Sequence, residues 1–141
     1  MTDTANPPST YIDVLILGAG LSGIGSACHL KKHCPEKTFV ILEAREAIGG
    51  TWDLFRYPGV RSDSDIFTFG FNFKPWTKAK SIADGAEIKQ YLEEAAAENG
   101  VDASIRFGHK VLTADWSDEA ALWMITAKVS GCAEIQVFTC K

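Results

Sequence analysis

The chain has 141 residues, 46% of them hydrophobic and 23% charged, with a formal net charge of −4 at pH 7. This length supports one hydrophobic core, so we expect one domain or part of one. The negative charge gives no electrostatic reason to expect nucleic acid as a partner. The sequence shows neither an apolar run of the ~20 residues that a membrane helix needs nor a signal-peptide pattern. Its 4 cysteines lack C-x-x-C spacing, which favours reduced thiols in a cytoplasmic protein.

The chain is expected to begin with a short tail and a buried strand. Residues 1–10 carry two prolines and small polar residues, and we predict a flexible tail there. Tyr11–Leu17 includes the continuously apolar run Val14–Leu17, which predicts a parallel strand buried on both faces. A glycine-rich turn follows, then a helix that should end before Pro35, and a second strand over residues 38–42. On the helix, His29 and His33 are one turn apart, but without a third ligand no metal site is expected.

The turn after the first strand has the spacing G-x-G-x-x-G, formed by Gly18, Gly20 and Gly23. Gly18 suits a tight turn, Gly20 lets a pyrophosphate approach bare backbone, and Gly23 lets the helix pack closely on the strand. The helix N-terminus, where Ser22 lies, offers N–H groups and partial positive charge to the same phosphates. Glu43 follows the last glycine by about 20 residues, where a carboxylate accepts ribose hydroxyls. The pattern predicts a dinucleotide site, and Glu43 argues against NADP there because it would repel a 2′-phosphate.

Residues 44–65 form a long, polar, turn-rich connection. It contains the runs Gly49-Gly50-Thr51-Trp52 and Tyr57-Pro58-Gly59-Val60-Arg61-Ser62-Asp63. Its aromatic residues and Pro-Gly turn favour a binding loop over a disordered segment. Next, an alternating aromatic pattern predicts a strand or extended segment with one aromatic face, packed in the core rather than lining a substrate pocket. The pattern consists of Phe67, Phe69, Phe71 and Phe73.

The second half of the chain predicts one helix and four short strands. The helix covers residues 84–99, with Asp84 and Glu87 as a capping box and Asn99-Gly100 as its end. Strand-like segments follow at 104–107, 109–116, 122–129 and 133–140. The expected fold class is α/β, a Rossmann-like βαβ unit with a parallel sheet and an appended antiparallel β-meander. Because three parallel strands make a small sheet, we expect the fold to be incomplete and further sequence to follow Lys141.

The glycine motif, Glu43 and the two runs of the binding loop together resemble the N-terminal FAD-binding region of Baeyer–Villiger monooxygenases. The sequence from Gly50 to Asp65 is most similar to that of the bacterial, ethionamide-activating branch of the family. The similarity covers residues 11–141, which would form the N-terminal part of an FAD-binding domain. Flavin-containing monooxygenases share the first half of the pattern, so a flavin-containing N- or S-monooxygenase is an alternative. A truncated, non-catalytic FAD-binding module is another.

The resemblance implies FAD and NADPH as cofactors, O2 as a co-substrate, and ketones, aldehydes or thioethers as substrates. It assigns the FAD diphosphate and ribose contacts to Gly18, Gly20, Ser22, Gly23 and Glu43. It places Thr51, Trp52, Asp53 and Leu54 along the flavin and ribityl chain, and it makes Gly50 a further cofactor contact. It assigns an adenine contact to Val111, and a place near the nicotinamide nucleotide to Arg61 and Ser62. Asp63 resembles the catalytic acid that faces the flavin and positions an active-site arginine.

Two of these residues also suit structural roles, and several family features are absent from the sequence. Trp52 is nearly as well explained as core, and Asp63 as a turn-capping aspartate within Ser62–Asp65. The 141 residues contain neither a second G-x-G-x-x-G for NADPH nor the family fingerprint F-x-G-x-x-x-H-T. They also lack a candidate for the downstream catalytic arginine. We therefore expect the isolated chain to be inactive.

Overall fold

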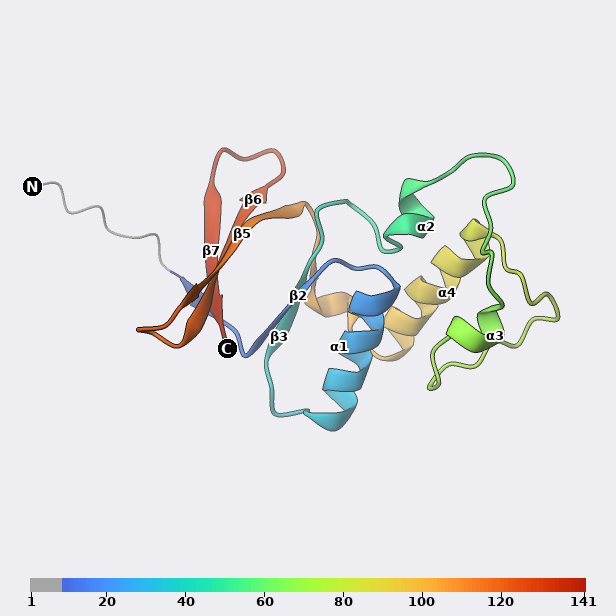
Figure 1. Cartoon of the computed structure of the whole chain (residues 1–141), viewed down its shortest axis with the longest axis horizontal. Coiled ribbons are helices and arrows are strands. Elements are labelled where there is room, and N and C mark those ends of the chain that lie inside the picture. The colour runs from blue at the N-terminus through green and yellow to red at the C-terminus, as the bar shows by residue number, and fades with distance from the viewer. Residues whose placement is uncertain (1–8) are drawn as a thin grey trace, which may run out of the picture.

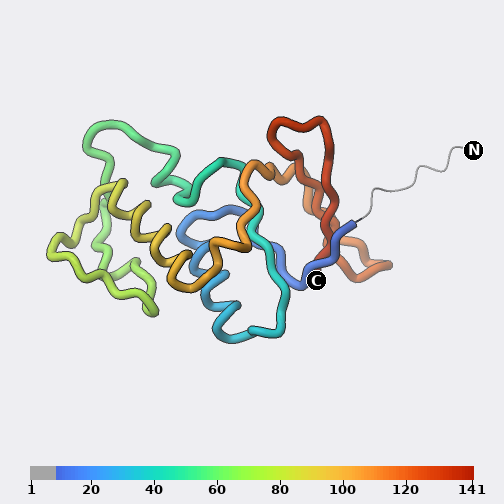
Figure 2. Tube along the Cα trace, turned by 180° about the vertical axis from the view of Figure 1, so that it is seen from behind, coloured from blue at the N-terminus to red at the C-terminus, as the bar shows by residue number. Residues whose placement is uncertain are grey.

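The computed structural model describes residues 9–141 as three layers (Figure 1). The middle layer is a parallel sheet in the order β2-β3-β4, with bounds Val14–Leu17, Phe39–Leu42 and Ile105–Arg106. Helices α1 (Leu21–His33) and α4 (Gly85–Glu98) cover one face, and a second sheet covers the other (Figures 1 and 2). Within residues 9–141, no helix has the length and apolar character needed to cross a membrane. The predicted α/β class with a Rossmann-like unit is confirmed.

The predicted first strand divides into two strands that belong to different sheets. β1 (Thr10–Tyr11) pairs in parallel with β7, whereas β2 pairs in parallel with β3. Between them, the Asp13 carboxylate accepts hydrogen bonds from the backbone N–H and hydroxyl of Thr38 at 2.8 and 2.7 Å. β2 is an edge strand and Leu17 is 53% exposed, so the expectation of burial on both faces is wrong at this end. Of the predicted tail over residues 1–10, residues 1–8 lie outside the described part of the chain. Thr10 belongs to β1.

The antiparallel meander is confirmed, but it belongs to a sheet of its own. This meander sheet has the order β1-β7-β6-β5, with β5 at His109–Ser117, β6 at Leu122–Val129 and β7 at Ile135–Cys140. Glu43, directly after β3, connects the two sheets through its backbone. Its N–H donates to the carbonyl of Arg106 at 3.0 Å, and its carbonyl accepts from the N–H of His109 at 2.9 Å.

The core has two parts, one on each side of the parallel sheet. On the helix side, Ile41 of β3 packs in one cluster with Ile24 of α1 and Leu92 of α4. On the other side, Leu42 packs with Phe138 of the meander sheet. Successive β3 residues thus face opposite layers, as the alternation of side chains along a strand requires. The predicted capping box at the start of α4 is also confirmed.

The aromatic repeat does not form a strand. α3 (Ile66–Phe69) is a single helical turn, in which the Asp65 carboxylate accepts the N–H of Phe67 at 2.7 Å. Phe67 is 56% exposed, so it is not part of the core. The expected core packing holds for the other three aromatics, Phe69, Phe71 and Phe73. The strand prediction failed because a local side-chain cap starts a helical turn inside a segment whose spacing matches a strand.

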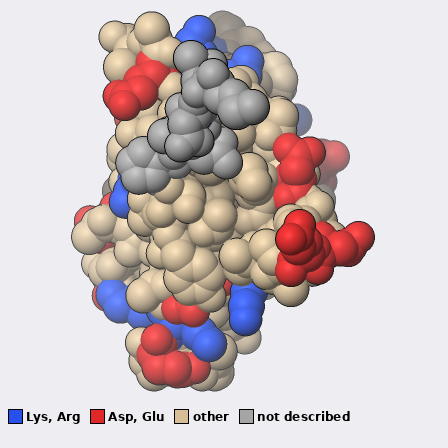
Figure 3. Space-filling view, turned by 90° about the vertical axis from the view of Figure 1, so that its left-hand side faces the viewer, with Lys and Arg blue, Asp and Glu red and all other residues tan. Residues whose placement is uncertain are grey.

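The end of the molecule formed by the meander sheet is partly apolar at its surface. On this face, acidic and basic side chains lie in separate small groups among other residues (Figure 3). The indole rings of Trp116 and Trp123, paired across β5 and β6, lie 5.6 Å apart, and both side chains are more than 40% exposed.

Candidate cofactor-binding site

The glycine-rich turn joins β2 to α1 in the conformation that its spacing predicts. Gly18 has a φ of +98°, which favours glycine. A Cβ atom on Gly23 would overlap the carbonyl oxygen of Gly18, so only glycine allows α1 to begin this close to the strand. The steric roles predicted for these two glycines are confirmed. Their phosphate contacts stay predictions.

A second pair of glycines, Gly49 and Gly50, lies against this turn. The N–H of Gly49 donates to the carbonyl of Ala19 at 3.0 Å. A Cβ atom on Gly20 would lie 3.6 Å from Gly50 Cα, and one on Gly50 would lie 3.1 Å from Gly20 Cα. Gly49 and Gly50 also have positive φ values of +133° and +53°. Two segments distant in sequence therefore meet here as bare backbone.

The two glycine segments line a cleft of about 300 Å³, which we call the glycine cleft. Its lining comprises Leu17, Gly18, Gly20, Leu21, Ser22 and Gly23 on one side and Gly49, Gly50, Thr51 and Trp52 on the other. Helix α1 begins at this cleft with Gly20 as its N-cap, and within residues 9–141 no side chain caps it. Its first turn therefore presents N–H groups and partial positive charge to the cleft.

Glu43 reaches the base of the turn from the end of β3. The residue is 6% exposed, and its Oε2 accepts the N–H of Ala19 at 2.7 Å. Its Oε1 accepts the N–H of Arg45 at 2.8 Å. A carboxylate has about four acceptor positions, so two are left for a ligand such as a ribose. The ribose role of Glu43 stays a prediction, and sequence reasoning missed the two backbone contacts, which hold the turn in place.

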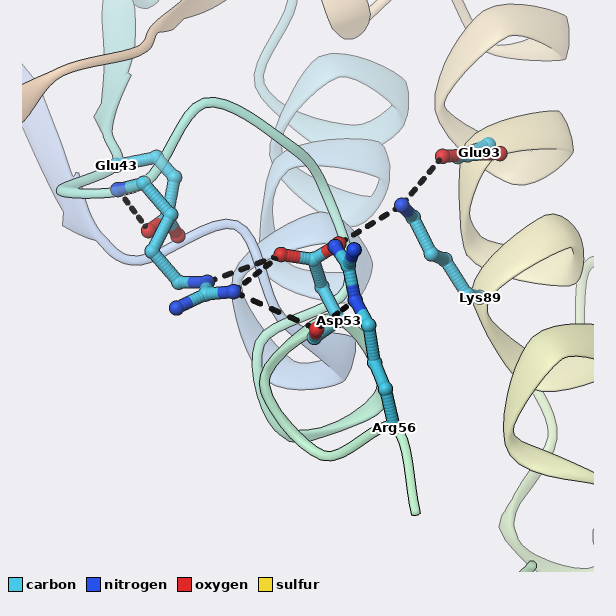
Figure 4. A network of polar contacts seen from close by, with 6 residues as sticks. Glu43, Asp53, Arg56, Lys89 and Glu93 are labelled. Atoms are coloured by element: carbon cyan, nitrogen blue, oxygen red, sulfur yellow. Dashed lines mark hydrogen bonds and ion pairs between the residues drawn. The ribbon is translucent and has the colours of Figure 1, made fainter. Parts of the chain in front are cut away.

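Asp53, which the resemblance places along the flavin and ribityl chain, lies among three cations, and its contact with the cofactor stays a prediction. It lies in α2 (Thr51–Leu54), is 2% exposed and falls outside the lining of the glycine cleft. Its carboxylate forms ion pairs with Arg45, Arg56 and Lys89 at 2.7, 2.7 and 2.8 Å (Figure 4). Hydrogen bonds from Lys89 and then Arg45 hold the pKa of Asp53 well below its ordinary value, although burial acts to raise it. Leu54 is 54% exposed and is likewise outside the cleft lining.

A second cleft, of about 500 Å³, contains the other predicted site residues of the binding loop. It is lined by Tyr57, Gly59, Arg61, Ser62, Asp63 and Ile82. The hydroxyl of Ser62, a buried residue, donates to the carbonyl of Ser64 at 2.7 Å and accepts the N–H of Ser64 at 3.0 Å. Asp63 is exposed and accepts the Ser64 hydroxyl at 3.2 Å. The local contacts fit the turn interpretation of Asp63, and its role toward a flavin stays a prediction.

Val111 lies in β5, apart from the lining of both clefts. It pairs with Ala127 and packs against the core between the two sheets. The strand register shifts between Val111 and Thr113, which marks a β-bulge. The adenine contact assigned to Val111 stays a prediction.

Sequence reasoning missed the three cations around Asp53. Arg56 follows Asp53 by three residues, and this spacing on a helical turn could have indicated an ion pair. Lys89 comes from α4, and the sequence carries no signal that brings it to α2.

Comparison with known proteins places these features in a family. Residues 16–84 match the NAD(P)-binding Rossmann-like domain. The chain is 62% identical over 121 residues to the FAD-containing monooxygenase EthA of Mycolicibacterium smegmatis, a match that covers 86% of this chain and 25% of that protein. It is 60% identical over 114 residues to the probable FAD-binding monooxygenase AlmA of an Acinetobacter species, covering 81% of this chain and 23% of that protein.

Solved structures give the same result for the fold. A steroid monooxygenase bound to NADP superimposes with a TM-score of 0.81 at 26% identity, covering 93% of this chain and 25% of that one. Cyclohexanone monooxygenase from Rhodococcus sp. Phi1, bound to NADP+, gives a TM-score of 0.81 at 27% identity and covers 95% of this chain and 25% of that one. The chain thus spans about a quarter of the length of the relatives it matches. The chain belongs to the family of FAD-containing monooxygenases of the Baeyer–Villiger type.

Proposed function

We propose that this chain supplies the FAD-binding part of a monooxygenase that uses NADPH and O2 to oxidise a ketone, an aldehyde or a thioether. The observation that carries the proposal is the glycine cleft, where the backbones of Gly20 and Gly50 face each other at the uncapped start of α1. The relatives named FAD-containing or FAD-binding monooxygenases support it.

The glycine cleft suits a dinucleotide diphosphate in three respects. Gly20 and Gly50 line it without side chains, so a ligand there meets bare backbone. The first turn of α1 offers N–H donors to an anion. Glu43, which lies at the base of the turn and outside the cleft lining, retains acceptor positions for ribose hydroxyls. Thr51 and Trp52 line the same cleft and would lie toward the flavin ring. FAD bound in this way supplies the redox and oxygen-transfer chemistry.

NADPH is proposed to act from the second cleft. Glu43 disfavours a 2′-phosphate in the glycine cleft, whereas Arg61 in the second cleft is an exposed cation. Asp63 lines the same cleft and would face the reacting region as the resemblance implies. We propose that catalysis requires residues outside these 141 in addition to this chain, because the relatives are about four times as long.

We also propose a cytoplasmic location. All four cysteines, Cys28, Cys34, Cys132 and Cys140, are free thiols in the described part of the chain, which fits a reducing compartment.

Titration of the purified chain with FAD, FMN and NADP+ tests the proposal. We expect about one FAD per chain and an affinity at least about ten-fold higher for FAD than for FMN, which lacks the adenosine half. NADP+ should not displace FAD. Equal affinity for FAD and FMN would contradict a dinucleotide site in the glycine cleft.

An activity assay tests whether catalysis requires residues outside these 141. The chain loaded with FAD and supplied with NADPH, O2 and a cyclic ketone or an alkyl sulfide should give no ester, lactone or sulfoxide above the uncoupled background. Product above that background would show that the 141 residues suffice.

A further inference from the structure

Helix α2 supports one wall of the glycine cleft, yet it is too short to hold its position alone. It comprises four residues, Thr51–Leu54, and its N-cap residue is Gly50, which has no side chain with which to cap the helix. Among its residues only Asp53 is buried, while Trp52 is partly buried against the core. A single helical turn has little intrinsic stability in water. The place of α2 therefore depends on what Asp53 and Trp52 contact.

Each carboxylate oxygen of Asp53 accepts two hydrogen bonds. Oδ2 accepts from Arg45 Nε at 3.0 Å and from Arg45 Nη2 at 2.7 Å. Oδ1 accepts from Arg56 Nη2 at 2.7 Å and from Lys89 Nζ at 2.8 Å. The backbone carbonyl of Asp53 also accepts from Arg56 Nε at 2.9 Å. Three cations surround one buried carboxylate, and a second acid, Glu93, lies 3.7 Å from Lys89.

The three cations come from three different places in the fold. Arg45 is in the loop after β3. Arg56 lies just past α2, and Lys89 is on α4 (Figure 4). Through Lys89, α2 is tied to a helix whose inner face belongs to the core. Through Arg45, it is tied to the loop beside Glu43. Removal of the Asp53 charge would release both connections at once and leave three cations without a common partner.

Displacement of α2 would move the cleft wall directly. Gly50 precedes the helix and lies so close to Gly20 that a Cβ atom on Gly50 would be 3.1 Å from Gly20 Cα, and Gly49 is hydrogen-bonded to Ala19. Asp53 itself does not line the cleft, whose lining on this side ends at Trp52. This geometry therefore offers no direct contact between the Asp53 carboxylate and a dinucleotide bound in the cleft.

We propose that Asp53 is a positioning residue for cofactor binding, which through Arg45, Arg56 and Lys89 holds α2 so that Gly50, Thr51 and Trp52 keep their place across the glycine cleft. This inference rests on the proposed function, since it takes the glycine cleft as the FAD site. It predicts that loss of the Asp53 charge loosens α2 even without ligand, and weakens FAD binding as a consequence.

The test uses the full 141-residue chain with Asp53→Asn, which keeps the side-chain shape. A second variant, Arg56→Met, removes one partner whose side chain is 70% exposed, so it leaves folding intact. The control is Trp76→Phe, a change in a buried side chain outside the cleft and α2, which loses a hydrogen bond to Lys80. Hydrogen exchange of residues 49–55 without FAD and the dissociation constant for FAD are measured for each protein.

We expect faster exchange in residues 49–55 for Asp53→Asn and, to a smaller degree, for Arg56→Met. The FAD dissociation constant should rise by about ten-fold or more in Asp53→Asn and stay within about two-fold of the wild-type value in Trp76→Phe. This difference should hold even if Trp76→Phe lowers the unfolding midpoint as much as Asp53→Asn does. Unchanged exchange at residues 49–55 in Asp53→Asn would overturn the positioning role whatever FAD does. Faster exchange with unchanged FAD affinity would overturn its link to the cofactor. A wild-type chain that binds no FAD would instead overturn the proposed function, and the link with it.

Discussion

Arg45 holds Asp53 by two hydrogen bonds to the same carboxylate oxygen, from Nε at 3.0 Å and from Nη2 at 2.7 Å. The backbone N–H of the same arginine donates to Glu43. The acid expected at the ribose and the helix expected along the flavin are therefore connected through one residue. A change at either carboxylate should affect the shape of the glycine cleft as well as its charge.

Glu43→Gln should destabilise the chain even without cofactor. The carboxylate accepts two backbone N–H groups, from Ala19 and Arg45, and an amide can replace only one of these acceptors. We expect a loss of about 1–3 kcal/mol in the free energy of unfolding, measured with urea. As a control, Glu98→Gln removes a 58% exposed carboxylate that pairs with Lys74, and the loss should stay below about 1 kcal/mol. Equal losses in the two variants would contradict the structural role of Glu43.

The stabilisation by Asp53 should depend on pH in a defined direction. Its pKa in the folded chain lies below the unfolded value of about 3.9, so its contribution is fully present above that value. The contribution is lost as the pH falls below about 4 toward the folded pKa. The difference in unfolding free energy between wild type and Asp53→Asn should accordingly be constant between about pH 7 and about pH 5 and shrink by about pH 3. A difference that does not change over this range would show that the ion pairs of Asp53 contribute nothing to stability.

Gly23→Ala should destabilise the strand–helix junction. The added Cβ atom would overlap the carbonyl oxygen of Gly18, and that oxygen belongs to backbone that cannot rotate away. We expect a loss of about 1–3 kcal/mol or more in the free energy of unfolding. Ser26→Ala, at an exposed position of the same helix, should change it by at most about 0.5 kcal/mol. Similar stability of the two variants would contradict the close packing at Gly23.

The parts of the fold that sequence predicted are those with local signals. The G-x-G-x-x-G turn, helix α1 and the capped helix α4 follow from glycine sterics and from side chains within three residues of the helix start. The meander followed from short strands between tight turns. In each case the residues that decide the structure lie next to one another in the chain.

The parts that sequence did not predict depend on distant partners. The separation of β1 from β2 rests on Asp13 bonding Thr38, which is 25 residues away in the sequence. The aromatic repeat is an exception, because the cap that Asp65 gives to Phe67 is local and the strand-like spacing of the aromatics concealed it. For the site, the resemblance assigned Gly20 and Gly50 to the same cofactor, but their close approach was not predicted. The environment of Asp53 could not be predicted, because Lys89 reaches it from another helix.

If FAD binds between the two glycine segments, its affinity should depend on the absence of a side chain at Gly50. Gly50 has a φ of +53°, an added Cβ atom would lie 3.1 Å from Gly20 Cα, and both glycines line the cleft. The matched control is Gly131→Ala, where φ is +74° and nothing lies within 4 Å, so it carries the same kind of backbone strain outside the cleft. We predict that Gly50→Ala raises the FAD dissociation constant by about ten-fold or more while Gly131→Ala leaves it within about two-fold. Equal FAD affinity in wild type and both variants would contradict FAD binding between the two glycine segments.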